Sequence, residues 1–82
     1  MRLRIIETNF TTKYDWLFRL IDQHNEIYYI MDDKFYRNHN IKSPITKQHL
    51  DSFDKGSSIN AIVREINGKK IVLQVWLRLI PW

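Results

Sequence analysis

Cysteine is absent from this chain of 82 residues. Its absence excludes disulfide bonds, thiolate nucleophiles, and zinc or iron–sulfur sites with cysteine ligands. Small secreted domains usually need disulfides or a metal to compensate for a small hydrophobic core. We therefore predict a protein of the cytoplasm that holds no cofactor.

Long hydrophobic runs are absent as well. No stretch approaches the roughly 18 apolar residues of a membrane-spanning helix, and segment 1–7 contains no apolar stretch of signal-peptide length. Hydrophobic residues make up 44% of the chain and charged residues 27%, which is typical of a soluble globular domain with one core. We predict a single domain over residues 1–82 with no membrane partner.

Glycine is scarce, and Gly56 and Gly68 both fall at predicted element boundaries. Asn67 and Gly68 form the pair that most readily adopts positive φ at both positions of a tight turn. We therefore predict a β-hairpin with strands over 58–66 and 69–80.

The two-residue turn also sets the register of this hairpin. It pairs Glu65 with Lys70, Val63 with Val72, Ala61 with Gln74 and Ile59 with Trp76. The side predicted to face the core carries Ile62, Ile66, Ile71, Leu73, Val75, Leu77 and Leu79. The other side is mixed, with Ile59, Val63, Val72 and Trp76 among Lys70, Gln74 and Arg78.

The first half of the chain indicates further elements. Segment 2–8 has the pattern of a strand, and segment 45–53 has the spacing of a short helix. Segments 16–21 and 26–31 are rich in aromatic and β-branched residues, which favours a second hairpin. The alternative is a long helix over about 12–24 that packs on an antiparallel sheet.

The favoured order is therefore three strands, one short helix and two strands. This is the order of a small five-stranded antiparallel OB-like barrel or curved sheet, so we predict a mainly β (or α+β) fold. OB-like barrels bind single-stranded nucleic acid or sugars, but element order alone carries little weight about function. No motif in the sequence is specific to a known family.

Residues that carry catalysis or bind metals occur only in isolation. The histidines are His24, His39 and His49. Their spacing matches no known metal site, and the acidic pair in segment 32–34 is predicted to lie in a solvated turn. Ser57 and Ser58 follow Gly56 without an implied base. We therefore predict a protein that is not an enzyme and binds no metal.

The net charge of +4 is unevenly distributed. Residues 1–41 hold six basic and six acidic side chains, whereas residues 42–82 hold seven basic and three acidic ones. Basic and aromatic residues alternate in several segments, and single-strand binders need both, because bases stack on rings while lysine and arginine contact phosphates. The aromatic residues assigned to the core are Trp16, Phe18, Tyr28 and Phe35.

Our leading hypothesis is a non-catalytic domain that binds single-stranded nucleic acid through a basic and aromatic strand face. The candidate binding residues are Tyr36, Arg37, Lys70, Gln74, Trp76 and Arg78. The mixed side of the hairpin also has the composition of a protein interface. The alternative is therefore a protein-binding module or small inhibitor, including a homodimer formed across the hairpin.

Overall fold

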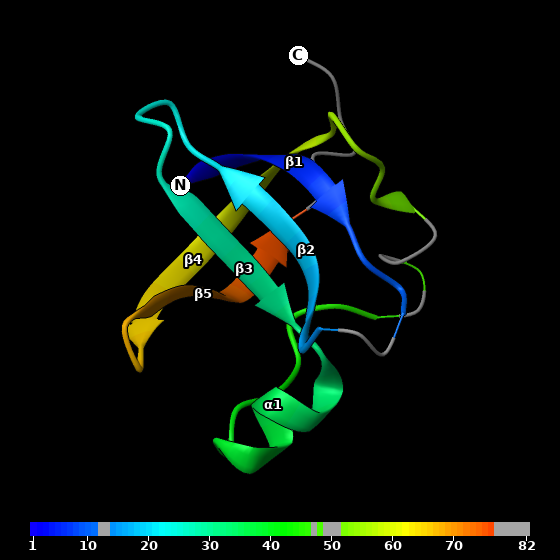
Figure 1. Ribbon diagram of the computed structural model, residues 1–82, viewed down its shortest axis with the longest axis vertical. Coiled ribbons are helices and arrows are strands. Elements are labelled where there is room, and N and C mark those ends of the chain that lie inside the picture. The colour runs from blue at the N-terminus through cyan, green and yellow to red at the C-terminus, as the bar shows by residue number, and fades with distance from the viewer. Residues whose placement is uncertain (12–13, 47, 49–51, 77–82) are drawn as a thin grey trace.

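A computed structural model describes residues 1–11, 14–46, 48 and 52–76 of the chain (Figure 1). The described elements are β1 (Arg2–Thr8), β2 (Trp16–Ile21), β3 (Ile27–Met31), α1 (Asp33–Asn38), β4 (Ser58–Ile66) and β5 (Lys69–Trp76). The mainly β class with a short helix is confirmed, and the order β-β-β-α-β-β is the predicted one, although α1 lies at 33–38 and the predicted helix lay at 45–53. None of the helical segments in the described part of the chain has the length and apolar character needed to cross a membrane.

The strands form one curved, barrel-like sheet. Hydrogen-bonded neighbours follow the order β1-β2-β3-β5-β4, and β4 pairs in turn with β1. Every neighbouring pair is antiparallel except β3 and β5, which are parallel, so the prediction of a wholly antiparallel sheet is wrong in this pair. The reason is topological: an odd number of strands joined in a ring cannot alternate in direction all the way round.

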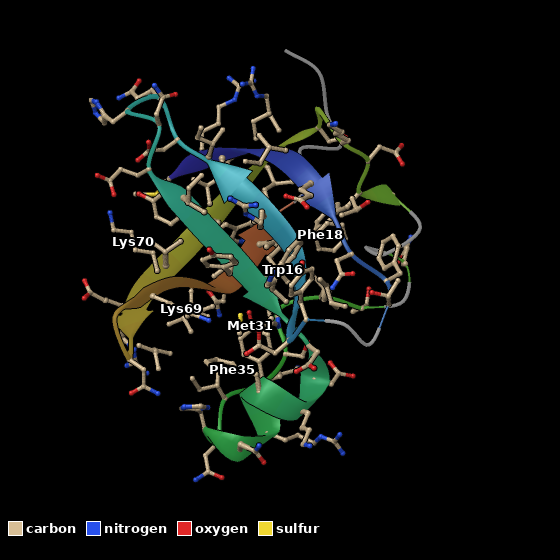
Figure 2. The ribbon with its side chains drawn as sticks, viewed as in Figure 1. Trp16, Phe18, Met31, Phe35, Lys69 and Lys70 are labelled. Carbon is tan, nitrogen blue, oxygen red and sulfur yellow. The ribbon has the colours of Figure 1, made fainter. Side chains whose placement is uncertain are left out.

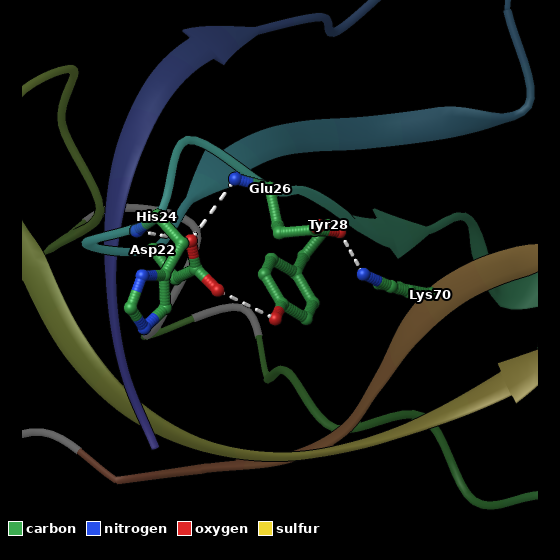
Figure 3. Close-up of polar contacts among 5 residues, drawn as sticks. All are labelled: Asp22, His24, Glu26, Tyr28 and Lys70. Carbon is green, nitrogen blue, oxygen red and sulfur yellow. Dashed lines mark hydrogen bonds and ion pairs between the residues drawn. The ribbon is translucent and has the colours of Figure 1, made fainter.

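The β2–β3 hairpin is confirmed, and the alternative of a long helix over about 12–24 is wrong. The turn is built on Asp22, whose carboxylate accepts hydrogen bonds from the backbone N–H groups of His24 (2.8 Å) and Glu26 (3.0 Å) (Figure 3). Asn25 adopts a φ of 64°, a conformation that asparagine tolerates better than most residues. Local turn chemistry thus favours two strands over one continuous helix.

Segment 32–34, predicted as a solvated turn, instead begins helix α1. The Asp32 side chain accepts a hydrogen bond from the backbone N–H of Phe35 at 2.9 Å, the usual N-cap interaction. Of the predicted helix over 45–53, residues 47 and 49–51 lie outside the described residues. Within that segment the Ser52 hydroxyl donates to the Gln48 carbonyl at 2.9 Å.

The β4–β5 hairpin turns where predicted, with φ of 52° at Asn67 and 80° at Gly68. The predicted pairs Glu65 with Lys70 and Val63 with Val72 are confirmed. Beyond them the register shifts.

The register shift is a β-bulge in β5. Ile62 pairs with Gln74 while Val63 pairs with Val72, so Leu73 is the extra residue. The remaining pairs become Ala61 with Val75 and Asn60 with Trp76, in place of the predicted Ala61 with Gln74 and Ile59 with Trp76. A shift of one residue exchanges the two faces of a strand. In β5 the bulge therefore turns Gln74 and Trp76 to the outer face, away from the buried Val72. In β4 the alternation is regular, but its inward face is the one predicted to be mixed: Ile59 and Ala61 are buried, whereas Ile62, predicted in the core, is 47% exposed.

Buried side chains form two clusters. The larger one fills the barrel interior and contains Leu3, Ile5, Phe18, Leu20, Tyr28, Ile30, Phe53, Ile59, Ala61 and Val72. The smaller one lies between the outer face of the sheet and α1 and contains Trp16, Met31, Tyr36 and Ile71. Figure 2 shows Met31 and Phe35 in this region, between the sheet and α1. Neighbouring residues Ile71 and Val72 therefore enter different clusters, so β5 is covered on both faces over this stretch.

The junction between β3 and β5 is held by side chains. Their ladder contains a single register pair, Tyr29 with Ile71. The buried Tyr36 hydroxyl donates to the Val72 carbonyl (2.7 Å) and accepts from the Met31 N–H (3.2 Å), which connects the two strands where the ladder ends. Burial also raises the pKa of Tyr36, so this hydroxyl stays protonated.

Candidate functional site

The predicted site residues are dispersed in the structure. Tyr36 has no exposed surface and bonds to Met31 and Val72, so it is wrong as a binding residue. Arg37 is exposed on α1. Arg78 lies outside the described residues.

Lys70 is occupied by contacts within the protein. Its ammonium group forms an ion pair with Glu26 and lies 5.5 Å from the ring centre of Tyr28 (Figure 3). The Tyr28 hydroxyl in turn donates to Asp22 at 2.8 Å. This group joins the β2–β3 turn to the start of β5, so Lys70 has a structural role in closing the sheet.

Gln74 and Trp76 are exposed near the end of β5, and the Trp76 side chain is 48% accessible. Their partners on β4 are Ile62 and Asn60. We call Ile62, Gln74 and Trp76 the hairpin face. The exposed Arg64 lies two residues along β4 from Ile62, on the same side of that strand, whereas Lys70 of the predicted face is paired with Glu26.

A different group of aromatic and basic side chains meets on the outside of β2 and β3. Its position depends on a bulge in β2, where Trp16 pairs with Met31 and Phe18 pairs with Ile30, which leaves Leu17 as the extra residue. Trp16 and Phe18 would share a face in a regular strand. The bulge places Phe18 in the barrel interior and Trp16 in the outer cluster.

Three aromatic rings lie together at this position. Tyr14 stacks on Trp16 with ring centres 5.3 Å apart and an interplanar angle of 13°. Tyr29, from β3, packs against the same indole at 6.3 Å in a tilted arrangement. Trp16 itself is 8% exposed, whereas Tyr14 is 48% exposed. The outermost surface of the stack is therefore a tyrosine ring supported from beneath by a fixed indole.

Two cations border these rings. The Arg19 guanidinium lies 5.8 Å from the Trp16 ring centre, and the Lys69 ammonium lies 5.7 Å from that of Tyr29. These distances are in the range of cation–π attraction. Figure 2 shows Lys69 projecting from β5 beside β3. We call Tyr14, Trp16, Arg19, Tyr29 and Lys69 the outer site.

One carboxylate lies next to the outer site. A bulge at Ile6 in β1 brings Glu7 opposite Arg19, and the Arg19 Nη1 donates to the Glu7 Oε1 at 2.8 Å. Arg19 is in turn paired with Tyr29 across β2 and β3. The ion pair orients the guanidinium along the face, but it also competes with any anionic ligand for that group.

The outer site can stack planar groups and attract negative charge. Stacking on tyrosine and contact of arginine or lysine with phosphate are the interactions by which proteins hold single-stranded nucleic acid without reading its sequence. Among the residues that the structure describes, no three histidine, aspartate or glutamate side chains gather closely enough to hold a metal ion. His39, for example, stacks on Phe35 at 4.2 Å, and its ring Nδ1 lies 2.9 Å from the Phe35 carbonyl.

Part of the outer site was visible in the sequence. Arg19 and Tyr29 alternate with the buried Phe18, Leu20, Tyr28 and Ile30, so a period of two already indicates that they face outward. Trp16 could not be found in this way, because alternation without a bulge places it beside Phe18. The sequence therefore assigned Trp16 to the core; it is buried, but in the cluster outside the barrel.

Comparison with protein-family models, with curated proteins and with solved structures finds no match to this chain. Its function is therefore inferred from the geometry and charge of its own side chains.

Proposed function

We propose that this chain is a small, non-catalytic domain that binds single-stranded nucleic acid on the outer site. The observation that carries the proposal is the joint presence of stacked rings and cations on one strand face, with Arg19 over Trp16 and Lys69 over Tyr29. A base can stack on the exposed Tyr14 ring while the two cations contact the neighbouring phosphates. Backbone contact of this kind is largely independent of base sequence.

Rigidity of the site supports the same proposal. Trp16 belongs to the cluster under α1, and Tyr29 lies in β3, so two of the three rings are held by the barrel before any ligand arrives. Pre-ordered side chains lose little conformational entropy on binding. The conformational entropy lost on binding therefore comes mainly from the nucleic acid and from Tyr14.

A salt titration tests the proposal. If Arg19 and Lys69 neutralise about two phosphates, the logarithm of the affinity should fall with the logarithm of salt concentration at a slope near −1.4 for single strands. Fluorescence anisotropy of a labelled oligonucleotide of about ten nucleotides, between about 50 and 200 mM salt, measures this slope. Absence of binding at the lower salt concentration contradicts the proposal, and a duplex of the same sequence serves as the comparison ligand.

Glu7→Gln is expected to increase the affinity for single strands by about two- to fivefold, which corresponds to the strength of an exposed ion pair. The substitution removes the carboxylate that accepts from Arg19 and leaves the guanidinium available to phosphate. The same anisotropy titration measures the change. Glu65→Gln is the matched control, because Glu65 is an exposed glutamate on β4 with no role in the outer site. Equal affinities for both variants would show that Arg19 does not contact the ligand.

A protein partner is the second candidate, and the half-exposed hairpin face supports it. Ile62 and Trp76 are outward-facing apolar residues that lie diagonally across β4 and β5, and about half of each is accessible. Exposed apolar groups rimmed by polar ones are typical of protein interfaces, including homodimers.

Trp76→Ala separates the two candidates. For nucleic-acid binding on the outer site, the affinity for the oligonucleotide should be unchanged and the loss of stability should stay below about 1 kcal/mol, because the side chain is half exposed. A homodimer across the hairpin would instead dissociate on dilution, as followed by light scattering. An affinity loss of about 1–3 kcal/mol would place the nucleic acid on the hairpin face and contradict the outer site.

A further inference from the structure

A cavity of about 680 Å³ lies between the β2–β3 turn and the beginnings of β1 and β4. Figure 1 shows the β2–β3 turn at the end of the barrel opposite α1. We call it the turn pocket. Its walls include Arg2, Arg4, Ile21, Asp22, Asn25 and Ser58. The volume is within the range of small-molecule sites.

The two arginines of the turn pocket project from one strand face. Leu3 and Ile5 point into the barrel interior, so Arg2 and Arg4 both point outward and are exposed. The register places Arg4 between Ile21 on β2 and Ser58 on β4. The guanidinium groups thus share a wall with an apolar side chain and a hydroxyl.

These guanidinium groups are available for a ligand. Within residues 1–11, 14–46, 48 and 52–76, the ion pairs are those of Arg19 with Glu7 and Lys70 with Glu26, and neither involves Arg2 or Arg4. The turn pocket therefore offers an anion two arginines that no carboxylate of the described chain neutralises.

The acidic residue of the turn pocket is already engaged by the turn itself. One oxygen of the Asp22 carboxylate accepts from the N–H groups of His24 and Glu26, and the other accepts from the Tyr28 hydroxyl at 2.8 Å (Figure 3). Three donors thus partly balance the negative charge and direct the carboxylate toward the backbone. The side chains of Asn25 and Ser58 add neutral donors to the same cavity.

We propose that the turn pocket binds the phosphomonoester of a nucleotide, either the terminal phosphate of a single strand or a free nucleoside monophosphate. A phosphomonoester carries about −1.5 to −2 charges at neutral pH and offers three acceptor oxygens, which two guanidinium groups match. The choice of a nucleotide rests on the proposed function, because Ile21 lies two residues along β2 from Arg19 and connects the turn pocket to the outer site. A strand held on the outer site can therefore place its end at Arg2 and Arg4.

The first test uses calorimetric titration with adenosine monophosphate and with adenosine. The monophosphate should bind the wild-type protein at least roughly tenfold more tightly than adenosine, because hydrogen bonds to a charged phosphate are stronger than those to a neutral hydroxyl. The double variant Arg2→Gln/Arg4→Gln should lose this difference. The control Lys34→Gln/Arg64→Gln removes the same charge from exposed positions on α1 and β4 and should retain it. Equal binding of the two compounds, or equal behaviour of the two double variants, overturns the proposal.

Oligonucleotides of about ten nucleotides, with and without a terminal phosphate, identify the source of the phosphate. Tighter binding of the phosphorylated strand, lost in Arg2→Gln/Arg4→Gln, indicates a strand end. Preference for the free monophosphate with no effect of strand phosphorylation indicates a mononucleotide site. The unphosphorylated strand reports on the outer site alone, so its failure to bind contradicts the proposed function without contradicting the turn pocket.

Discussion

Tyr36→Phe is expected to destabilise the protein by roughly 1–3 kcal/mol, although it removes a single oxygen atom. The hydroxyl bonds to the Val72 carbonyl and the Met31 N–H, and both backbone groups would remain buried without this partner. These bonds continue the β3–β5 connection past its single register pair. Thermal and urea unfolding followed by circular dichroism measure the loss.

Tyr29→Phe provides the control for this prediction. Tyr29 is half-buried, on β3, and loses the same atom, but its hydroxyl is not part of the β3–β5 connection. It should therefore unfold close to the wild-type midpoint. If Tyr36→Phe proved as stable as Tyr29→Phe, the Tyr36 hydroxyl would have no role in closing the sheet.

Tyr29→Leu is expected to weaken single-strand binding by about 1–3 kcal/mol, or about 5- to 150-fold in affinity. The substitution keeps an apolar side chain beside Trp16 but removes the ring that faces Lys69. Anisotropy titrations at the lower salt concentration measure the loss, and thermal unfolding shows whether the fold is retained.

Tyr29→Phe is also the control for this binding prediction. It preserves the aromatic ring, so it should bind single strands with the affinity of the wild type. If the leucine variant bound as tightly as the phenylalanine variant, the Tyr29 ring would have no part in holding the single strand. If both variants bound weakly, the hydroxyl rather than the ring would be the contact, and the site would recognise its ligand by hydrogen bonding.

The turn residues determined the hairpins. Asn67-Gly68 occurs where the chain reverses with positive φ at both positions, and the polar segment after Ile21 folds around the Asp22 carboxylate. Such turns depend on side chains within a few residues, so local sequence is sufficient to recognise them. Aromatic and β-branched composition likewise identified β2 and β3 as strands.

The direction in which each side chain points, and the side chains that it meets, were decided by the tertiary structure. The bulges at Leu17 and Leu73 each shift a register, which turned Trp16 out of the barrel interior and turned Gln74 and Trp76 to the outer face of β5. A bulge depends on how two strands fit the curvature of the whole sheet, so no pattern within one strand reveals it. The prediction of a basic and aromatic face on the hairpin failed for this reason.

The charged residues show the same difference between what the sequence and what the tertiary structure determine. The sequence places the excess of basic residues in the second half, yet Lys70 is paired with Glu26 from the first half. Arg2 and Arg4 belong to a half with equal numbers of acidic and basic residues, and they face a pocket free of ion pairs in the described part of the chain. Which charge is available depends on which strands become neighbours.

By itself, the sequence determined a cysteine-free, mainly β chain with its strands, its two hairpin turns and their order, because these follow from local propensity and turn chemistry. Only the tertiary structure decided that β3 and β5 run parallel, that Tyr36 joins them, and that Trp16, Arg19 and Lys69 meet on one surface. These contacts join residues up to tens of positions apart. An odd number of strands closing on itself must contain at least one parallel pair, and which strands form that pair depends on the packing of the whole sheet, so no local pattern carries the constraint.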